Sequence, residues 1–320
     1  DVDLDLMEPN QGLASFAAKA IVHLDNYLKE SKPDMILVQG DTTTVFAAAL
    51  AAFYNRIPVG HIEAGLRTGD IYAPFPEEVN RMLATRMTSI HFAPTRTNKE
   101  NLLREGVEEK TIYITGNTVI DALYIARDRV LKEPQSIPGL DIRKLADKKI
   151  VLITGHRRES FGEGFENICT AIARLAKAFP DVLFIYPVHL NPNVQEPVRR
   201  ILGTPSTHNI QLIKPLSYLP FVDLMNRSVL ILTDSGGIQE EGPSLKKPVL
   251  VMRDVTERPE GVQAGVVKLT GTDPERINNS VSELLTDHVA YDRMIANQNP
   301  YGDGNAAKKI INLIKHQYAV

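Results

Sequence analysis

The stretch DMILVQGDTTTVFAAALAAFYNRIPVGHIEA, residues 34–64, decides the fold class. Its first part, 34–40, is a short apolar run with the length of a buried strand. The alanine-rich segment 43–56 has the length of a helix, and 57–64 is again a strand. A strand, a helix and a second strand in this order predict a β-α-β unit with two parallel strands.

The same alternation continues through most of the chain. In the first half we expect strands at 90–95 and 112–116 and helices at 76–89, 97–106 and 119–132. In the second half we expect strands at 149–155, 182–188, 210–215, 229–233 and 248–252, and helices at 165–179 and 219–228. Alternating strands and helices favour an α/β fold with helices on both faces of a parallel sheet.

Residues 133–149 interrupt the alternation with two prolines, a glycine and mixed charge. Two doubly wound, Rossmann-like sheets in series are therefore expected, facing each other across a cleft, with ligands at the carboxyl ends of the strands. We expect an N-terminal domain at 1–116, completed by a C-terminal helix at 301–320, and a second domain at 117–300. The first half is expected to be incomplete, because a two-sheet protein ordinarily has a βα unit or two before such a strand.

Composition excludes several other classes of protein. The chain has 320 residues, 43% of them hydrophobic and 23% charged, with a net charge of −3, which argues against a disordered or nucleic-acid-coating protein. The longest apolar runs are too short to span a bilayer, and the acidic start lacks the pattern of a signal peptide. Cys169 is the only cysteine, so we expect neither a disulfide framework nor a Cys-rich zinc site, and a cytoplasmic location.

A glycine-containing turn follows the strand at 229–233. The sequence there is DSGG (234–237), and IQEEGPSL (238–245) then begins a helix. Backbone N–H groups at a helix start attract anions, glycine lets a phosphate approach, and Ser235 adds a hydroxyl donor. The lysine and spacing of a nucleotide-hydrolysing P-loop are missing. The turn therefore predicts either a phosphate site or simply a tight strand-to-helix connection.

Acidic and basic residues beside this turn favour a nucleotide. Glu241, one helical turn beyond the glycines, is placed to accept hydrogen bonds from both ribose hydroxyls, as acids do in dinucleotide folds. Glu240 is expected instead to cap the helix or face solvent. Arg253 and Arg258 follow the next strand, and their planar guanidinium groups suit a diphosphate, although a solvated loop would also explain them.

Three carboxylates flank strand ends in the first half. Asp41 follows the strand at 34–40, Glu63 ends the strand at 57–64, and Glu77 opens a helix after two prolines. Since strand ends of a parallel sheet share one edge, the three acids are expected to converge there as acid–base groups. Separate explanations also exist: Asp41 as a helix N-cap, Glu63 on a loop, and Glu77 as an acid favoured in a first helical turn.

Two histidines follow strands of the second half. His156 and Arg157 follow the strand at 149–155, and two arginines beside a histidine favour an anionic ligand. His189 lies at the end of the strand at 182–188, between prolines that suggest a fixed loop. A lone histidine is more often structural than catalytic, so both readings stay open on these residues alone.

A series of motifs resembles a known family. They are listed here in chain order: GDTTT (40–44), GHIEAGLRTGD (60–70), PFPEEVNR (74–81), TGNTVIDAL (115–123), GHRRESFG (155–162), YPVHLNPNV (186–194), LTDSGGIQEEGPSL (232–245), VMRDVTERPEGVQAGVVKLTGTD (251–273) and NPYGDG (299–304). Together they resemble the non-hydrolysing UDP-N-acetylglucosamine 2-epimerases from near residue 1 to about 310. So many motifs in one order are highly specific.

The resemblance implies a fold like that of the GT-B glycosyltransferases, with a UDP-sugar in the cleft. It implies interconversion of UDP-N-acetylglucosamine and UDP-N-acetylmannosamine, which feeds surface polysaccharide synthesis, by a homodimer. In that family UDP is eliminated to leave a 2-acetamidoglucal and is added back to the other face, and neither a nicotinamide nor a metal takes part.

The resemblance also implies roles for residues of this chain. Asp41, Glu63 and Glu77 become the acid–base carboxylates, and His156 assists departure of the diphosphate. The remaining implied contacts with the nucleotide are Ser235, Gly236 and Gly237 at phosphate, Glu241 at ribose, Arg258 beside the diphosphate and Phe221 near uracil.

Two features depart from the family pattern. Members begin with a strand and a GTRPE loop whose Arg, together with a Lys beyond it, contacts substrate, and these 320 residues contain neither. Many bacterial members also bind a second UDP-N-acetylglucosamine as activator, partly through an Arg whose place Asn10 takes here. Gln11, Arg157 and His189 are the residues that would still serve such a second site.

Three other functions remain possible on sequence grounds. A GT-B UDP-sugar glycosyltransferase would share the nucleotide site but needs an acceptor groove and usually one base. A hydrolysing 2-epimerase would release free N-acetylmannosamine from the same intermediate. A UDP-sugar sensor without catalysis would need no acid cluster.

Overall fold

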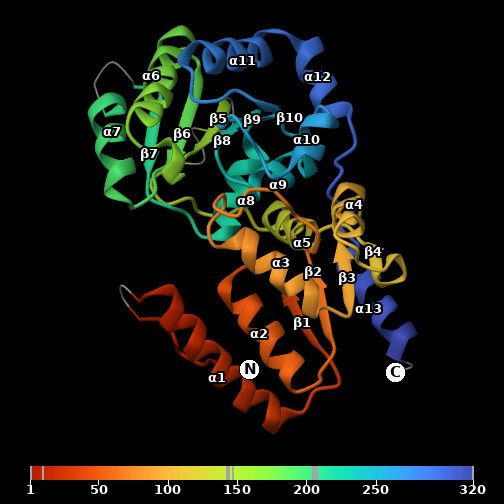
Figure 1. The fold of residues 1–320 in the computed structure, drawn as a ribbon. Helices are drawn as coiled ribbons and strands as arrows, with labels where there is room; N and C mark the ends of the chain where they lie inside the picture. The colour runs from red at the N-terminus through yellow and green to blue at the C-terminus, as the bar shows by residue number, and fades with distance from the viewer. Residues whose placement is uncertain (1, 9–10, 142–144, 146–147, 204–207, 319–320) are drawn as a thin grey trace. The chain divides into compact units, whose positions relative to one another are not determined.

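A computed structural model describes residues 2–8, 11–141, 145, 148–203 and 208–318 of the chain (Figure 1). The chain divides into two compact units, and each is described by itself. Unit 1 comprises residues 1–118 and 301–320, and unit 2 comprises residues 119–300. The proline-containing segment after residue 132 therefore lies inside unit 2 and does not separate the units.

Unit 1 contains, among its described residues, a four-stranded parallel sheet in the order β1-β2-β3-β4. Its strands are β1 (Ile36–Gln39), β2 (Val59–Ile62), β3 (Ile90–Ala93) and β4 (Ile112–Ile114). The connections are α2 (Thr43–Tyr54), α3 (Glu77–Met87), α4 (Arg96–Arg104) and the short 3-10 helix η1 (Glu109–Thr111). Because all four strands are parallel, every strand ends at the same edge, where its following loop begins.

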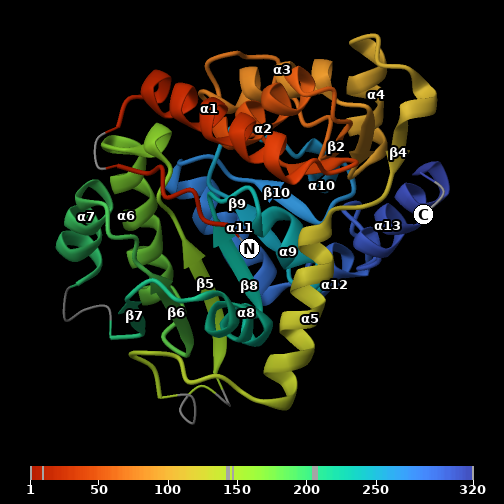
Figure 2. The ribbon, with the colours of Figure 1, turned by 90° about the horizontal axis from the view of Figure 1, so that it is seen from below.

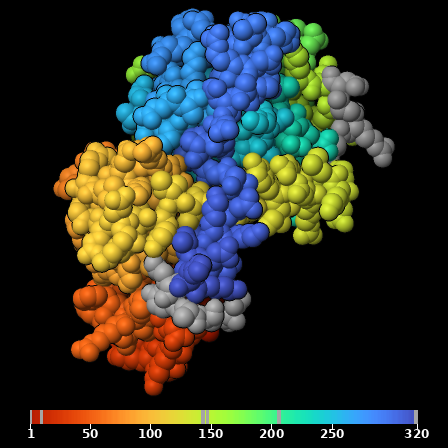
Figure 3. All heavy atoms as spheres, turned by 90° about the vertical axis from the view of Figure 1, so that its right-hand side faces the viewer, coloured from red at the N-terminus to blue at the C-terminus, as the bar shows by residue number. Residues whose placement is uncertain are grey.

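Two helices from the ends of the chain complete unit 1. The helix α1 (Leu13–Ser31), which the strand pattern does not predict, buries Leu28 in a cluster with α2 and β1. The expected C-terminal helix is α13 (Ala306–Tyr318), whose Ile310 packs with Phe92 of β3. In the space-filling view α13 (dark blue) lies beside the yellow segment that carries α4 and β4 (Figure 3).

Unit 2 contains a six-stranded parallel sheet among its described residues, in the order β10-β9-β8-β5-β6-β7 (Figure 2). Its strands are β5 (Lys149–Thr154), β6 (Val182–Pro187), β7 (Ile210–Ile213), β8 (Leu230–Thr233), β9 (Val249–Val251) and β10 (Val267–Leu269). Strands added outward on one side of β5 and then on the other give the doubly wound order of dinucleotide-binding folds. The α/β fold with two parallel sheets is thus confirmed.

Helices cover both faces of the unit 2 sheet. One hydrophobic cluster joins the sheet to α6 (Glu163–Ala178), α7 (Pro192–Leu202) and α11 (Pro274–Thr286). A second cluster joins the opposite face to α5 (Thr118–Lys132), α8 (Tyr218–Arg227) and α9 (Ile238–Ser244). The remaining elements are η3 (Arg158–Ser160), α10 (Pro259–Gln263) and α12 (His288–Ala296). Since both faces are covered, the strands are continuous apolar runs, which is why their positions are predictable.

Candidate active site

The strand order of unit 2 reverses between β5 and β8, which are hydrogen-bonded neighbours. A doubly wound sheet binds its ligand at such a reversal, because the two following loops leave the sheet toward opposite faces. Gly155 and His156 follow β5, and Asp234 and Ser235 follow β8. Two of the sequence motifs, separated by nearly eighty residues, therefore meet at one point of the sheet.

Asp234 joins these two strand ends. Its carboxylate is fully buried and accepts hydrogen bonds from the backbone N–H groups of His156 at 2.6 Å and Arg157 at 2.8 Å. Its second oxygen, Oδ1, lies 3.4 Å from Nδ1 of the His156 imidazole. No role for Asp234 is predicted from the sequence, although its place directly after a strand is a signal for one.

The His156 ring has a defined orientation and charge. It stacks on the ring of His189, with centroids 5.3 Å apart and planes inclined by 17°. Burial lowers the pKa of His156; the Asp234 carboxylate opposes that shift, whereas Arg157 and His189 add to it. The imidazole is therefore neutral near pH 7, and an N–H on Nδ1 facing Asp234 would leave Nε2 as a hydrogen-bond acceptor.

The turn after β8 is built around a close approach of Arg258. Ser235 donates its backbone N–H to the Thr233 hydroxyl at 3.0 Å, and α9 begins three residues later. A Cβ atom added to Gly236 would lie 2.6 Å from Nη1 of Arg258, closer than real contacts allow. A side chain at position 236 would therefore force the Arg258 guanidinium to move.

Arg258 is held by two carboxylates. Its Nε donates to Glu240 at 2.5 Å and its Nη1 donates to Glu257 at 2.9 Å. The expectation that Glu240 caps the helix or faces solvent is wrong: Glu240 is 2% exposed, because it pairs with this arginine. Burial opposes ionisation of Glu257, yet Arg258 and Arg253 together hold its pKa at about 2. Glu240 and Glu257 therefore neutralise arginines beside the candidate phosphate site.

Glu241 and Phe221 lie on neighbouring helices of unit 2. Glu241 on α9 is buried, and Tyr218 of α8 donates its hydroxyl to Oε1 at 2.7 Å. Burial raises the pKa of Glu241 and the nearby Glu240 adds to the shift, whereas the Tyr218 bond opposes it. Phe221, one turn along α8 from Tyr218, is partly buried against the sheet. The carboxylate predicted to bind ribose, Glu241, and the aromatic ring predicted to lie near uracil, Phe221, are thus positioned by α9 and α8.

In unit 1, the structure places Asp41 and Glu63 at neighbouring strand ends. The N–H of Gly40, after β1, donates to the carbonyl of Ile62 in β2 at 3.1 Å. A Cβ atom on Gly40 would lie only 3.4 Å from Oε2 of Glu63, so the Glu63 carboxylate reaches across to the start of the β1 loop. The alternative that Asp41 is the N-cap of α2 is wrong, because Thr42 occupies that position.

Glu63 has an unusual backbone conformation. Its φ is +66°, in the left-handed region that side chains other than glycine, asparagine and aspartate seldom adopt. Asn117 donates its side-chain N–H to Oε1 of Glu63 at 3.2 Å. Such backbone strain persists where the surroundings fix it and is concentrated at functional sites.

Glu77 is the first residue of α3, and the same helix contacts Asp41. Asn80 donates to the carbonyl oxygen of Asp41 at 3.0 Å, and Arg81 forms an ion pair with its carboxylate at 2.8 Å. These residues lie three and four positions after Glu77, on the same face of the helix. Glu77 itself is partly buried and makes no side-chain hydrogen bond or ion pair with any residue that the structure describes.

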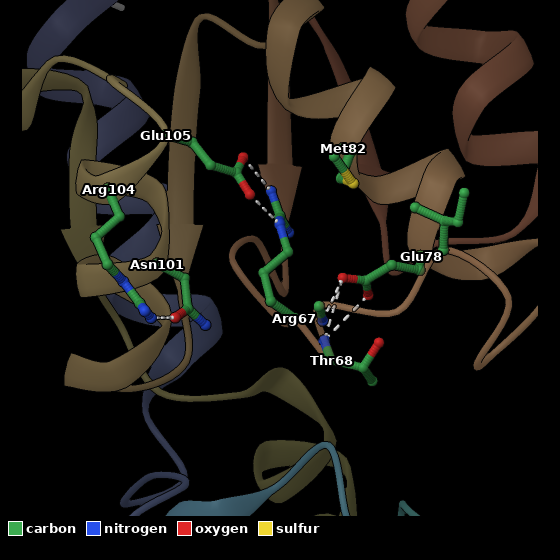
Figure 4. Close-up of a pocket in the computed structure, with 9 residues that line it drawn as sticks. Arg67, Thr68, Glu78, Met82, Asn101, Arg104 and Glu105 are labelled. Carbon is green, nitrogen blue, oxygen red and sulfur yellow. Dashed lines mark hydrogen bonds and ion pairs between the residues drawn. The ribbon is translucent and has the colours of Figure 1, made fainter.

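A pocket of about 390 Å³ beside α3 is formed by the loop at 67–71 and α4 (Figure 4). The charged residues that line it are not among those predicted from the sequence. Glu78, 1% exposed, accepts the backbone N–H groups of Thr68 at 3.1 Å and Gly69 at 3.0 Å. Arg67 binds Glu105 through two hydrogen bonds at 2.6 and 2.9 Å, which lower the pKa of Glu105. The charges therefore hold the loop that leads to Glu77.

The residues predicted for a second nucleotide-sugar site fall in both units. Asn10 lies outside the described residues. Gln11, in unit 1, is partly buried and donates to the carbonyl of Leu6 at 3.2 Å. Arg157 and His189, in unit 2, both adjoin His156.

In the described part of the chain, no cluster of three or more His, Cys, Asp or Glu side chains is arranged to hold a metal ion. Within the same residues, every helix is too short or too polar to cross a membrane.

Comparison with known proteins gives close matches over the whole chain. The profile of the family described as UDP-N-acetylglucosamine 2-epimerase matches residues 1–315. The chain is 57% identical over 319 residues to the UDP-N-acetylglucosamine 2-epimerase of Yersinia pestis, covering 99% of this chain and 84% of that protein.

Two solved structures resemble the fold equally closely. One is the UDP-GlcNAc 2-epimerase of Neisseria meningitidis bound to UDP-GlcNAc, with a TM-score of 0.90 and 49% identity, covering 98% of this chain and 85% of that one. The other is MnaA of S. aureus with UDP, also with a TM-score of 0.90, at 45% identity, covering 98% of this chain and 84% of that one.

Proposed function

The chain belongs to the non-hydrolysing UDP-N-acetylglucosamine 2-epimerase family, and from this premise we propose that it interconverts UDP-N-acetylglucosamine and UDP-N-acetylmannosamine at C2. The observation that carries the proposal is the match, over 98% of the chain, to a relative whose structure was solved with UDP-GlcNAc. The two groups of polar side chains at strand ends supply the contacts and proton-transfer groups that such a reaction needs.

Unit 2 is proposed to bind the nucleotide. Ser235 offers its hydroxyl to the diphosphate, and Gly236 and Gly237 offer N–H groups, at the strand-order reversal where such folds bind ligands. Arg258 is already paired with Glu240 and Glu257, so its proposed role is to support this turn beside the diphosphate. Glu241 accepts the ribose hydroxyls, and Phe221 lies near uracil.

His156 is proposed to assist departure of UDP. A neutral imidazole whose Nδ1 faces the buried Asp234 presents its other nitrogen, Nε2, to the ligand. When bound diphosphate places negative charge there, protonation of Nε2 is favoured and the resulting cation stabilises the leaving group.

Unit 1 is proposed to move the protons. One carboxylate among Asp41, Glu63 and Glu77 takes the proton from C2 as the bond from C1 to the UDP oxygen breaks, which leaves a double bond between C1 and C2. In the return step another of these acids gives a proton to the opposite face of C2, while UDP adds back to C1. A C2 hydrogen is barely acidic, so the base needs a site from which water is excluded and simultaneous loss of UDP.

Several further properties are proposed on the same family premise. The enzyme is a cytoplasmic homodimer that supplies surface polysaccharide synthesis. A second UDP-N-acetylglucosamine binds as activator through Gln11, Arg157 and His189. Among the alternatives, a hydrolysing 2-epimerase and a GT-B glycosyltransferase differ from the proposal in their products, and a UDP-sugar sensor would form none.

Incubation of the protein with UDP-N-acetylglucosamine alone separates these functions. We expect UDP-N-acetylmannosamine to form until an equilibrium is reached, and the same equilibrium when the reaction starts from the other isomer. Product analysis by NMR makes the measurement. Free N-acetylmannosamine and UDP would indicate the hydrolysing enzyme, whereas an absence of turnover until a sugar acceptor is added would indicate the transferase.

Replacing Glu241 with Ala is expected to weaken UDP binding by roughly tenfold to a hundredfold. The reason is that each hydrogen bond to a buried carboxylate contributes about 1.5–3 kcal/mol, and 1.4 kcal/mol corresponds to about tenfold in affinity. Calorimetric titration with UDP makes the measurement.

Tyr218→Phe is the matched control, because it removes the hydroxyl that Glu241 accepts and keeps the carboxylate. Its UDP affinity is expected to remain within a fewfold of the wild type. Unchanged UDP affinity in the Glu241→Ala protein would remove the ribose role.

A further inference from the structure

Arg81 is a buried cation shared between two carboxylates of unit 1. Its side chain is 4% exposed. Nη2 lies 2.8 Å from Oδ2 of Asp41, and Nη1 lies 3.3 Å from Oε2 of Glu78. The Asp41 side chain is 25% exposed to solvent, whereas that of Glu78 is 1% exposed.

The guanidinium of Arg81 is incompletely hydrogen-bonded. Its Nε and Nη1 have no hydrogen-bond partner among the residues that the structure describes. By contrast, Arg67 in the same unit donates to Glu105, Thr85 and the Leu66 carbonyl. Burial of a cation with unused donors is costly unless a charge interaction offsets it. The contact with Asp41 is the shorter of the two that do so.

Other titratable groups also lie on the elements beside Asp41. The neighbouring strand contributes His61, whose Nε2 donates to the Gly40 carbonyl at 2.7 Å, and burial lowers the pKa of His61 to about 4, so that it is neutral. The end of that strand contributes Glu63, and α3 contributes Glu77 and Glu78 besides Arg81. Among these groups Arg81 is therefore the one that favours the ionised form of Asp41.

We propose that Arg81 is a positioning residue for epimerisation, which holds Asp41 ionised and fixed against α3, and that Glu78 limits the strength of this hold. Arg81 acts through Asp41 and touches no substrate atom. The inference rests on the proposed function, because it assumes that Asp41 takes part in proton transfer. It adds that the proton affinity of Asp41 depends on the interaction of the Arg81 guanidinium with both Asp41 and Glu78.

The competing explanation is that the ion pair only fastens α3 to the loop after β1. Both explanations predict that loss of Arg81 harms the protein. They differ in the pH dependence of kcat/KM. Loss of a contact that only fastens α3 lowers kcat/KM at every pH, whereas loss of a contact that sets the charge of Asp41 shifts the pH at which kcat/KM declines on the acid side.

The test compares Arg81→Met, Arg81→Lys and Glu78→Gln with the wild type. Arg81→Met removes the charge, so the acid-side decline is expected to move to higher pH by about one unit or more, as for loss of a cation beside a carboxylate. Glu78→Gln keeps an oxygen for the Thr68 and Gly69 N–H groups but removes the competing charge, so the decline is expected to move to lower pH. Arg81→Lys is expected to leave the decline near its wild-type position and to restore part of the kcat lost in Arg81→Met.

Arg86→Met is the matched control, because Arg86 lies on the same helix and is exposed. It is expected to leave both kcat and the pH profile unchanged. Thermal unfolding of each variant separates loss of folded protein from loss of turnover, and UDP affinity measures the nucleotide site independently. If Arg81→Met does not fold, Arg81→Lys and Glu78→Gln still decide the question.

Opposite displacements in the Arg81→Met and Glu78→Gln proteins would support the proposal. An acid-side decline that stays in place in Glu78→Gln, and in Arg81→Met where it folds, would overturn it and leave a fastening role. Failure of the proposed function is a separate outcome, because in that case the wild-type protein itself would not convert UDP-N-acetylglucosamine.

Discussion

Asp41→Asn, Glu63→Gln and Glu77→Gln are each expected to lower kcat by at least about a hundredfold, the low end for a positioned acid or base. The substitutions keep the size of each side chain and remove its ability to exchange a proton at neutral pH. Asp41 and Glu63 lie at adjacent strand ends, and Glu77 begins the helix that contacts Asp41. Initial rates with UDP-N-acetylglucosamine make the measurement.

UDP affinity serves as the internal control for these three proteins. The proposed nucleotide contacts belong to unit 2, so binding of UDP is expected to stay close to the wild-type value while turnover falls. A variant that turns over at nearly the wild-type rate would remove that residue from the mechanism. Parallel loss of UDP affinity and folded protein would instead indicate a structural role.

Epimerisation in D₂O is expected to place deuterium at C2 of essentially every product molecule. If one acid removes the hydrogen from one face and a different acid delivers a proton to the other, the new hydrogen must come from a group that exchanges with solvent. A single base would have to reach both faces of C2, so several carboxylates at one sheet edge favour the two-sided arrangement. Mass spectrometry and proton NMR of the product measure the incorporation.

The same experiment tests the redox alternative. A nicotinamide-dependent epimerase that oxidises and reduces C4 would leave the C2 hydrogen in place. The sequence disfavours that route, because no Gly-x-Gly-x-x-Gly turn follows any of its strands. Product that retains its original C2 hydrogen, or activity that requires added NAD, would contradict the elimination mechanism and the roles of Asp41, Glu63 and Glu77.

Strand positions in unit 2 were predictable because both faces of its sheet are covered. A strand buried on two sides is a continuous apolar run between turn residues, as at 149–154 and 230–233. The helix α1 precedes the first strand, and β10 has a lysine between its two apolar residues, so neither belongs to a strong alternating pattern. The break after residue 132 was visible, but a loop rich in proline does not reveal to which unit it belongs.

Individual charges were harder to predict than strand ends. Glu77 and Glu78 are adjacent and chemically identical, yet successive helical positions point about 100° apart, so only one of them is turned inward to the Thr68 and Gly69 N–H groups. Asp234 and Glu240 likewise find their partners on segments distant in the chain. Periodicity identifies which face of an element is apolar, but it does not identify which buried acid meets which arginine.

The packing of α13 on β3 has a consequence for synthesis of the protein on the ribosome. Unit 1 is built from both ends of the chain, and Ile310 of α13 shares a cluster with Ile90 and Phe92. All of unit 2 is translated before α13 emerges. Unit 2 can therefore form its hydrophobic core while the apolar face of β3 is not yet covered by α13. Unit 1, whose translation begins first, thus finishes folding after unit 2. A nascent chain halted before residue 306 would expose the apolar face of β3 to chaperones.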